Sequence, residues 1–226
     1  MTSTLSPPAA TPPDPDGDGL VGAAVRLAVA AARRAGSFSA AGVAEALEAP
    51  VRALSRKAVS DALAQPHPVA TTSRLAAALG ERSRSPLLSG STAVALATKV
   101  ARQVGPLRFL ARRTPMWVVA AAVPALHASI SRGVEELGLV ASHLVHRSRA
   151  AGVEPDLERV RRAAVQVVSG APVDPGAEPR HRPLARAWAQ RAFRATLPLA
   201  PAVATRHPER LAAAAAAVPP HVLARR

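Results

Sequence analysis

The sequence predicts an all-α protein, an irregular multi-helix bundle with a disordered N-terminal leader. Two observations support this fold class. Apolar residues recur at intervals of three and four in the long segments, which is the spacing of one helix face. Capping residues bracket the same segments, and none of them alternates apolar and polar residues as a half-buried strand does. The composition agrees, because alanine, the best helix former, is abundant and only 2% of the residues are aromatic.

The N-terminal part is predicted as a leader followed by two helical segments. Residues 1–18 are rich in proline, threonine, serine and aspartate, and such a segment buries too little surface to offset the entropy of ordering. A helix is expected over residues 19–35, with Gly36 as its stop. Residues 37–65 are expected to form two short helices or one kinked helix, because Pro50 removes a backbone hydrogen bond.

Two further helices are predicted before the middle of the chain. Residues 71–73 are threonine and serine, which are good N-caps, and the helix they begin is expected to end at Gly80. Residues 91–104 are expected to form another helix, because the Gly105-Pro106 pair that follows is a strong stop signal.

The central segment, residues 114–170, has the clearest helix signals, and we expect the fold to be organised around it. Thr114 is a suitable N-cap and Pro115 suits the first helical position. Pro124 is expected to kink or divide the helix. Beyond it the following residues form one apolar stripe at intervals of three and four: Leu126, Ile130, Val134, Leu137, Ala141 and Leu144.

The polar residues of that helix are expected on the opposite side: Arg132, Glu135, Glu136, Arg147 and Arg149. Gly152 is expected to end the helix. Asp156 and Glu158 then lie in the first turn of a new one, where carboxylates favour the positive end of the helix dipole, and Gly170 is its predicted end.

These boundaries predict one core domain and an extension. We expect a leader (1–18), a helical core domain (19–170), a proline-rich linker (171–183) and a C-terminal helical extension (184–226). The extension is expected to hold helices over 184–197 and 207–218 and to fray at its end.

The chain is strongly basic, with a net charge of +14, and nearly all of its basic residues are arginine. This charge has two interpretations. It could form a surface for nucleic acid or an anionic membrane. It could also reflect the codon usage of a high-GC genome such as that of an actinomycete. The absence of cysteine excludes disulfides, thiolate catalysis and cysteine-ligated zinc.

The densest basic segment lies in the predicted C-terminal extension. A basic helix with aromatic residues is typical of a membrane or nucleic-acid surface. The alternative is a docking helix whose arginines are merely solvated. The candidate residues for binding an anionic surface are Arg180, Arg182, Arg186, Arg191, Arg194 and Trp188.

Candidate metal ligands are few. His143 and His146 are three residues apart and therefore share a helix face, and Glu136 lies one heptad before His143. A metal site needs three or four converging ligands, so a pair of ordinary histidines is the alternative that we favour. We predict no cofactor and no catalytic residues, because no nucleophile and base occur in a recognised motif.

Residues 114–131 carry no charge, yet they are fewer than the roughly 20 apolar residues that a membrane crossing needs. We therefore predict a buried core helix, with an interfacial segment as the alternative. The N-terminus lacks the basic and apolar regions of a secretion signal. The expected location is the cytoplasm, with a peripheral position at the inner face of the membrane as the alternative.

The middle of the chain resembles the EcsC-like family of bacterial helical proteins. The resemblance consists of a basic segment (Arg108, Arg112, Arg113), a proline-led small-residue helix over 115–123, and an R-G-x-x-E-L-x-x-V-A pattern over 132–141. It implies a helical protein with membrane-linked roles and no established catalytic residues.

The sequence thus predicts a non-enzymatic interaction or scaffold protein. Its expected partner is a protein or an anionic membrane surface. Nucleic-acid binding through an arginine-rich surface is the second hypothesis.

Overall fold

The computed structural model describes most of the 226-residue chain. Some predictions lie outside the described residues: residues 1–14 of the predicted leader, the helix over 91–104, and the helix start at Thr114 and Pro115. The prediction that the leader extends to residue 18 was wrong, because the first helix already begins at Pro15. The described residues are 15–35, 38–64, 69–84, 116–174, 177–178, 180–195 and 208–225.

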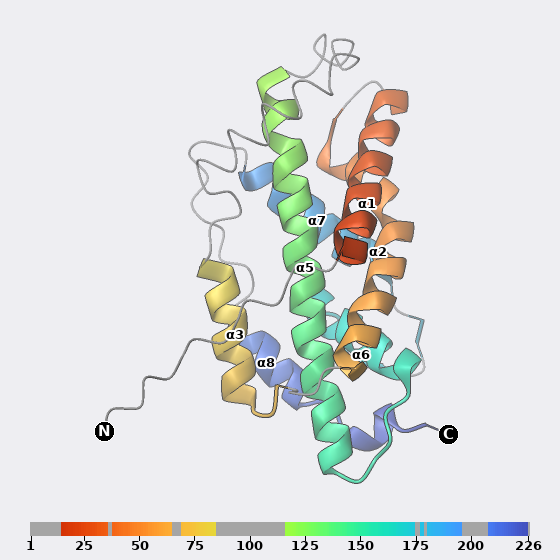
Figure 1. Cartoon of the computed structure of the whole chain (residues 1–226), viewed down its shortest axis with the longest axis vertical. Helices are drawn as coiled ribbons and strands as arrows, with labels where there is room; N and C mark the ends of the chain where they lie inside the picture. The colour runs from red at the N-terminus through yellow and green to blue at the C-terminus, as the bar shows by residue number, and fades with distance from the viewer. Residues whose placement is uncertain are drawn as a thin grey trace, which may run out of the picture.

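The described residues form helices and no strand, so the predicted all-α bundle is confirmed (Figure 1). An isolated bridge between Pro155 and Ala224 is their one β-type pairing. The elements are α1 (Pro15–Ala35), α2 (Ala40–Ala64), α3 (Thr72–Arg84), α5 (Met116–Ala150), α6 (Leu157–Ser169), α7 (His181–Ala195), α8 (Pro208–Ala216) and the 3-10 helix η2 (Pro220–Leu223).

Helix α5 runs the length of the molecule and contacts every other described helix (Figure 1). Its predicted apolar stripe is buried, apart from Val134, which is partly buried. The prediction of a single polar side was wrong at Glu136, which is only 5% exposed. The reason is that α5 is covered from several directions, so more than one of its faces is buried.

The two internal prolines do not divide their helices. Pro50 lies within α2 and Pro124 within α5, and both helices continue past the proline. Of the two outcomes expected at Pro124, a kink or a division, the division does not occur. Packing along both helices stabilises the helical conformation on either side, which outweighs the loss of one backbone hydrogen bond.

Several predicted helix ends are confirmed in atomic detail. The Thr71 hydroxyl accepts a hydrogen bond from the Arg74 backbone N–H at 3.2 Å. Asp156, expected in the first turn of α6, is instead its N-cap, and its carboxylate accepts a hydrogen bond from the Arg159 N–H at 2.9 Å. Gly170 ends α6 in the left-handed conformation, with φ of 69°. Gly80, by contrast, does not end α3, which continues to Arg84.

The C-terminal helices belong to the same core as the rest of the chain. Trp188 of α7, Leu211 of α8 and Leu223 of η2 are buried in the one apolar cluster that also includes α2 and α5. The predicted boundary at residues 171–183 therefore does not separate two units. Helix α7 in fact begins inside that linker, at His181.

The expected linker and frayed end are both held by hydrogen bonds. The buried amide of Gln166 donates to the Asp174 carbonyl at 2.9 Å and accepts from its N–H at 3.1 Å. The N–H of Asp156 donates to the Leu223 carbonyl at 2.8 Å. These bonds satisfy backbone groups that would otherwise need water, and they hold Asp174 against Gln166 and Leu223 against the start of α6.

Candidate functional site on helix α7

Helix α7 has one face in the core and one in solvent. Its buried residues follow the helical spacing of three and one: His181, Leu184, Ala185, Trp188, Ala189 and Ala192. Its outward side carries exposed arginines, and a further exposed arginine directly precedes the helix. We call these four residues the α7 ridge: Arg180, Arg182, Arg186 and Arg194.

The α7 ridge gathers exposed positive charge along and just before one helix. Within the described part of the chain, no ridge arginine forms an ion pair closer than 4.0 Å. No acidic residue occurs in the first turn of α7 to offset them. The ridge therefore presents guanidinium groups whose hydrogen-bond donors are available to an anion.

Trp188 does not belong to this surface, contrary to the prediction. It is fully buried, and its ring lies against Gly133 of α5 so closely that a Cβ atom there would overlap the indole. The Ser129 hydroxyl donates to the Trp188 carbonyl at 2.8 Å. Trp188 thus joins α7 to α5, because its position on the helix is an inward one.

Arg191 is also excluded from the surface. Its guanidinium makes two parallel hydrogen bonds of 3.0 Å to the Glu136 carboxylate, and both side chains are mostly buried. This bidentate geometry is the strongest that an arginine and a carboxylate form. Arg191 therefore links α7 to α5 instead of facing a ligand.

The same pair removes Glu136 from the candidate metal ligands. His143 is separately engaged, since its Nδ1 lies 3.0 Å from the Val69 carbonyl and the side chain is 1% exposed. Burial lowers the pKa of His143, which favours the neutral ring. His146 is partly exposed. Among the described residues, no three histidines and carboxylates converge as a metal site would need.

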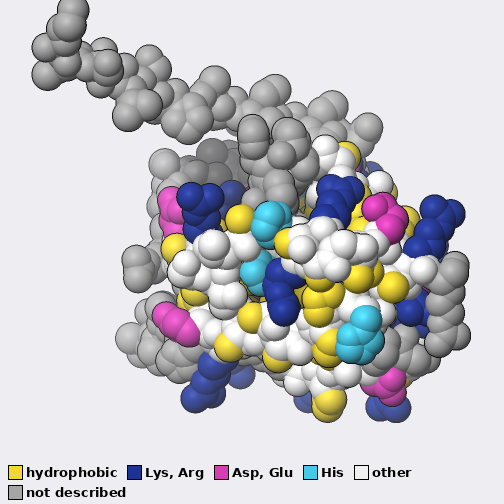
Figure 2. Space-filling view, turned by 90° about the horizontal axis from the view of Figure 1, so that it is seen from below, with side chains coloured by type: hydrophobic (Ala, Val, Ile, Leu, Met, Phe, Trp, Pro, Cys, Tyr) yellow, Lys and Arg dark blue, Asp and Glu magenta, His cyan; other side chains and the backbone are white. Residues whose placement is uncertain are grey.

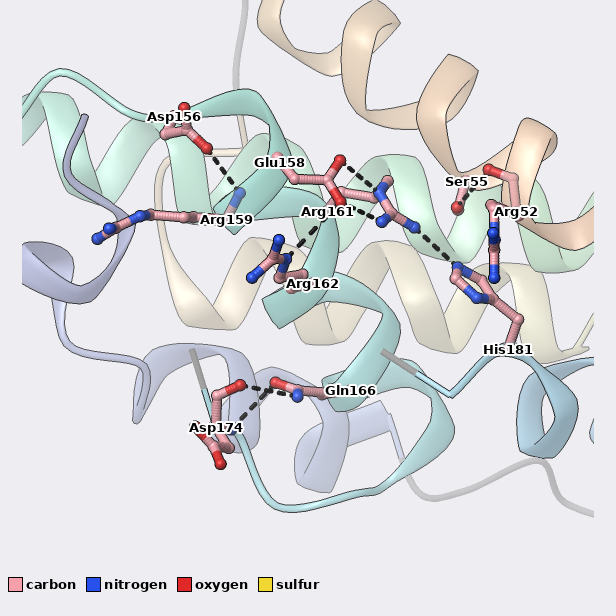
Figure 3. A network of polar contacts seen from close by, with 10 residues as sticks. All are labelled: Arg52, Ser55, Asp156, Glu158, Arg159, Arg161, Arg162, Gln166, Asp174 and His181. Atoms are coloured by element: carbon pink, nitrogen blue, oxygen red, sulfur yellow. Dashed lines mark hydrogen bonds and ion pairs between the residues drawn. The ribbon is translucent and has the colours of Figure 1, made fainter. Parts of the chain in front are cut away.

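A polar cluster that the sequence did not predict lies where α2, α6 and α7 meet (Figure 3). Arg161 is 3% exposed, and its Nε donates to a Glu158 oxygen at 2.8 Å. A second guanidinium nitrogen, Nη2, donates to the other Glu158 oxygen. The Nη1 group lies 2.8 Å from His181 Nε2. Arginine can only donate, so Nε2 accepts and the His181 ring is neutral.

Burial, assisted by the charges of Arg161 and Arg52, lowers the pKa of His181 to about 4. The pKa of Glu158 is also lowered, mainly by the hydrogen bond from Arg161. The contact between Arg161 and Glu158 could have been predicted from the sequence, because Arg161 lies on the apolar stripe of α6, three residues after Glu158. The contact between Arg161 and His181 could not, because His181 belongs to another helix.

Other arginines of the described chain also serve the fold. Arg147 Nη1 donates to the carbonyls of Ala215, Ala216 and Val218, and thereby satisfies backbone acceptors at the C-terminal end of α8. Arg82 pairs with Glu135 at 2.5 Å. At the lower end of the molecule, basic side chains are spread among acidic and apolar ones rather than gathered in one patch (Figure 2). The net charge is therefore partly structural.

Comparison with known proteins adds no relative. No protein-family model, curated protein or solved structure matches this chain. Among the helices that the structure describes, none has the length and apolar content that a membrane crossing requires.

Proposed function

We propose that this chain is a non-enzymatic helical interaction protein that docks on an anionic surface through the α7 ridge. The anionic inner face of a membrane is the partner that we favour, in line with the role that the EcsC-like resemblance implies. The observation behind the proposal is a contrast at α7: its inward arginine is paired, whereas its three outward arginines and Arg180 just before the helix are exposed and form no ion pair among the described residues.

The electrostatics of such a ridge suit reversible docking. Each basic residue near an anionic lipid surface contributes about 1 kcal/mol, so a few arginines provide moderate and salt-sensitive binding. The ridge lies on a helix whose other face is anchored in the core. Its side chains are therefore presented without the ordering cost that a disordered basic segment would have.

Vesicle flotation tests this proposal. We expect the protein to float at low salt with vesicles that contain phosphatidylglycerol, but not with neutral phosphatidylcholine vesicles. High salt should release the protein, because dissolved ions then screen the attraction between its arginines and the lipid headgroups. The triple variant Arg182→Gln/Arg186→Gln/Arg194→Gln should lose most of the binding. The matched control, Arg26→Gln/Arg74→Gln/Arg210→Gln, removes the same charge from exposed positions on other helices.

Equal loss in both triple variants would mean that net charge alone drives binding, and it would reject the ridge. Absence of flotation at low salt would remove the membrane as the partner. A gel-shift series then decides the nucleic-acid hypothesis, which requires affinity that falls steeply with salt and that depends on the ridge.

A further inference from the structure

Helix α1 presents an apolar face to solvent. The helix packs against α2 and α5 at one side of the bundle (Figure 1). On its outer side Leu20 is 38% exposed and Leu27 is 51% exposed, and they are two of the three large apolar side chains that the described residues expose. They lie about two helical turns apart and therefore share one face. A single exposed leucine is ordinary, whereas apolar side chains gathered on one face indicate a contact surface.

The same face continues through small residues to an arginine. Ala23 is partly exposed, and Ala30 and Arg34 are exposed. With the two leucines they recur at intervals of four and three, which is the spacing of a helix that meets another helix along a seam. We call these five residues the α1 seam: Leu20, Ala23, Leu27, Ala30 and Arg34.

Arg26 borders the α1 seam and leaves its apolar residues open. A Cβ atom placed on Gly22 would lie 3.4 Å from Arg26 Nη1, so the arginine side chain extends back over the preceding turn. Gly22 is on the side of α1 away from Leu20 and Leu27, since it is not three or four positions from either of them. The Arg26 side chain therefore does not cover the leucines.

The α1 seam is complementary in size to a second copy of itself in the antiparallel direction. A two-fold axis near Val25 would bring Leu20 opposite Ala30 of the second copy, and Ala23 opposite Leu27 of the second copy. In a two-fold contact each of these pairs occurs twice. Every large side chain of the seam then meets a small one, which allows close packing of the two helices.

Charge favours the same direction. By its position in the sequence of α1, Asp16 continues the register of the seam one turn before Leu20. Asp16 and Arg34 are equally far from Val25, so the antiparallel pairing brings each opposite the other. A parallel pairing would oppose Arg34 to Arg34 and Asp16 to Asp16, and such juxtaposed like charges disfavour an interface.

We propose that α1 is a self-association surface, along which two copies of this chain pair in the antiparallel direction. The occupant is a second copy because the two halves of the seam match each other in size and in charge. The inference is independent of the docking proposed for the α7 ridge, which lies on another helix. Few side chains of each copy take part, so we expect a reversible dimer with a dissociation constant on the order of 10 μM.

Sedimentation velocity, measured from well below to well above that concentration, tests the dimer. We expect the original chain to shift from monomer to dimer as its concentration rises. Leu27→Gln should weaken association at least about tenfold, because a two-fold contact loses the side chain twice. The matched control Leu157→Gln removes an exposed leucine from α6 and should leave association unchanged. Circular dichroism verifies the fold of each variant.

A charge exchange tests the partner pairs. Arg34→Asp should weaken association, because it opposes two acidic residues. Asp16→Arg/Arg34→Asp should restore association, because opposite charges face each other again. A double variant that associates no better than Arg34→Asp would overturn the antiparallel pairing.

Introduced cysteines report the direction of pairing, because the chain has none of its own. In Leu20→Cys/Ala30→Cys the two thiols of one chain are roughly 15 Å apart along the helix, too far for an internal disulfide. Mild oxidation should therefore join two chains of this variant, whereas Leu20→Cys alone should give no covalent dimer. Covalent dimers of Leu20→Cys alone would indicate a parallel pairing and overturn the inference.

Three further outcomes would also overturn it. The first is a chain that stays monomeric at every concentration. The second is equal weakening in Leu27→Gln and Leu157→Gln. The third is a monomer whose flotation with anionic vesicles is lost in Leu27→Gln, which would assign the exposed leucines to the membrane instead of a second copy.

Discussion

The two faces of α7 use the same residue type for opposite purposes. On the inner face, Arg191 is paired with Glu136 and lies beside the buried Trp188. On the outer face, Arg186 is exposed and makes no ion pair within the described structure. The two arginines are only five positions apart along the chain. An arginine-rich helix is therefore not by itself a binding surface, because position on the helix decides which arginines a ligand can reach.

The largest expected effect comes from removing the aromatic anchor of the inner face. Trp188→Ala deletes a fully buried indole and should lower the free energy of unfolding by about 3–5 kcal/mol. Urea denaturation followed by circular dichroism measures this change, with Ala187→Gly at an exposed position of the same helix as the comparison. A loss below about 1 kcal/mol would show that α7 is not an integral part of the core.

The arginine comparison itself can be tested with one matched pair. Arg191→Gln leaves the buried Glu136 carboxylate without its bidentate partner and should cost about 3 kcal/mol. Arg186→Gln removes an exposed charge and should change stability by no more than about 0.5 kcal/mol. Similar effects of the two substitutions would contradict the division into inner and outer arginines.

The contact between Gly133 of α5 and Trp188 of α7 predicts a smaller loss of stability, and this loss should depend on the indole ring. Gly133→Ala places a methyl group in the volume of the indole and should cost about 1–3 kcal/mol. In a Trp188→Leu background the same substitution should cost less, because the overlapping ring is gone. Thermal or urea unfolding of the original chain, the two single variants and the double variant gives the coupling energy. Strictly additive changes in the free energy of unfolding would exclude direct contact as the cause.

A dependence on pH should distinguish the buried contact between Arg161 and His181 from the exposed arginines of the α7 ridge. The pKa of His181 is about 4 in the folded chain, against an ordinary value of 6.5. As the pH falls below 6.5, the unfolded chain takes up a proton before the folded chain does. Stability is therefore complete above that pH and declines toward pH 4, by up to about 1.4 kcal/mol per pH unit.

The lowered pKa values of His143 and Glu158 act in the same direction. His181→Gln keeps an oxygen that can accept from Arg161 but cannot titrate, so it should flatten part of the decline between pH 6.5 and 4. Urea unfolding at a series of pH values measures both slopes. An unchanged slope in His181→Gln would assign the decline to other groups.

Local signals predicted the parts of the fold that depend on neighbours in sequence. Helix caps at Thr71 and Gly170 follow from the chemistry of single residues, and both occur in the structure. Asp156, expected in the first turn of α6, is its N-cap. The buried stripe of α5 follows from its spacing. The prediction at Glu136 was wrong because periodicity shows where one face lies and does not reveal how many neighbours cover the helix.

Less of the candidate site could be predicted. Four of the five arginines chosen from the sequence are exposed, whereas Arg191 and Trp188 face inward. Composition alone treats all members of a basic segment alike, since it carries no information on which side docks. The predicted metal candidates were separated for the same reason: Glu136 and His143 each have a partner from a distant part of the chain.

The helical character of this protein follows from local signals, because alanine content, capping residues and apolar spacing act over a few residues. Packing between helices determines which charged groups are paired inside the fold and which stay exposed. The bond between Arg161 and His181 spans 20 residues, and that between Glu136 and Arg191 spans 55. Such pairs form only when packing brings separate helices together, and burial then sets their charge state.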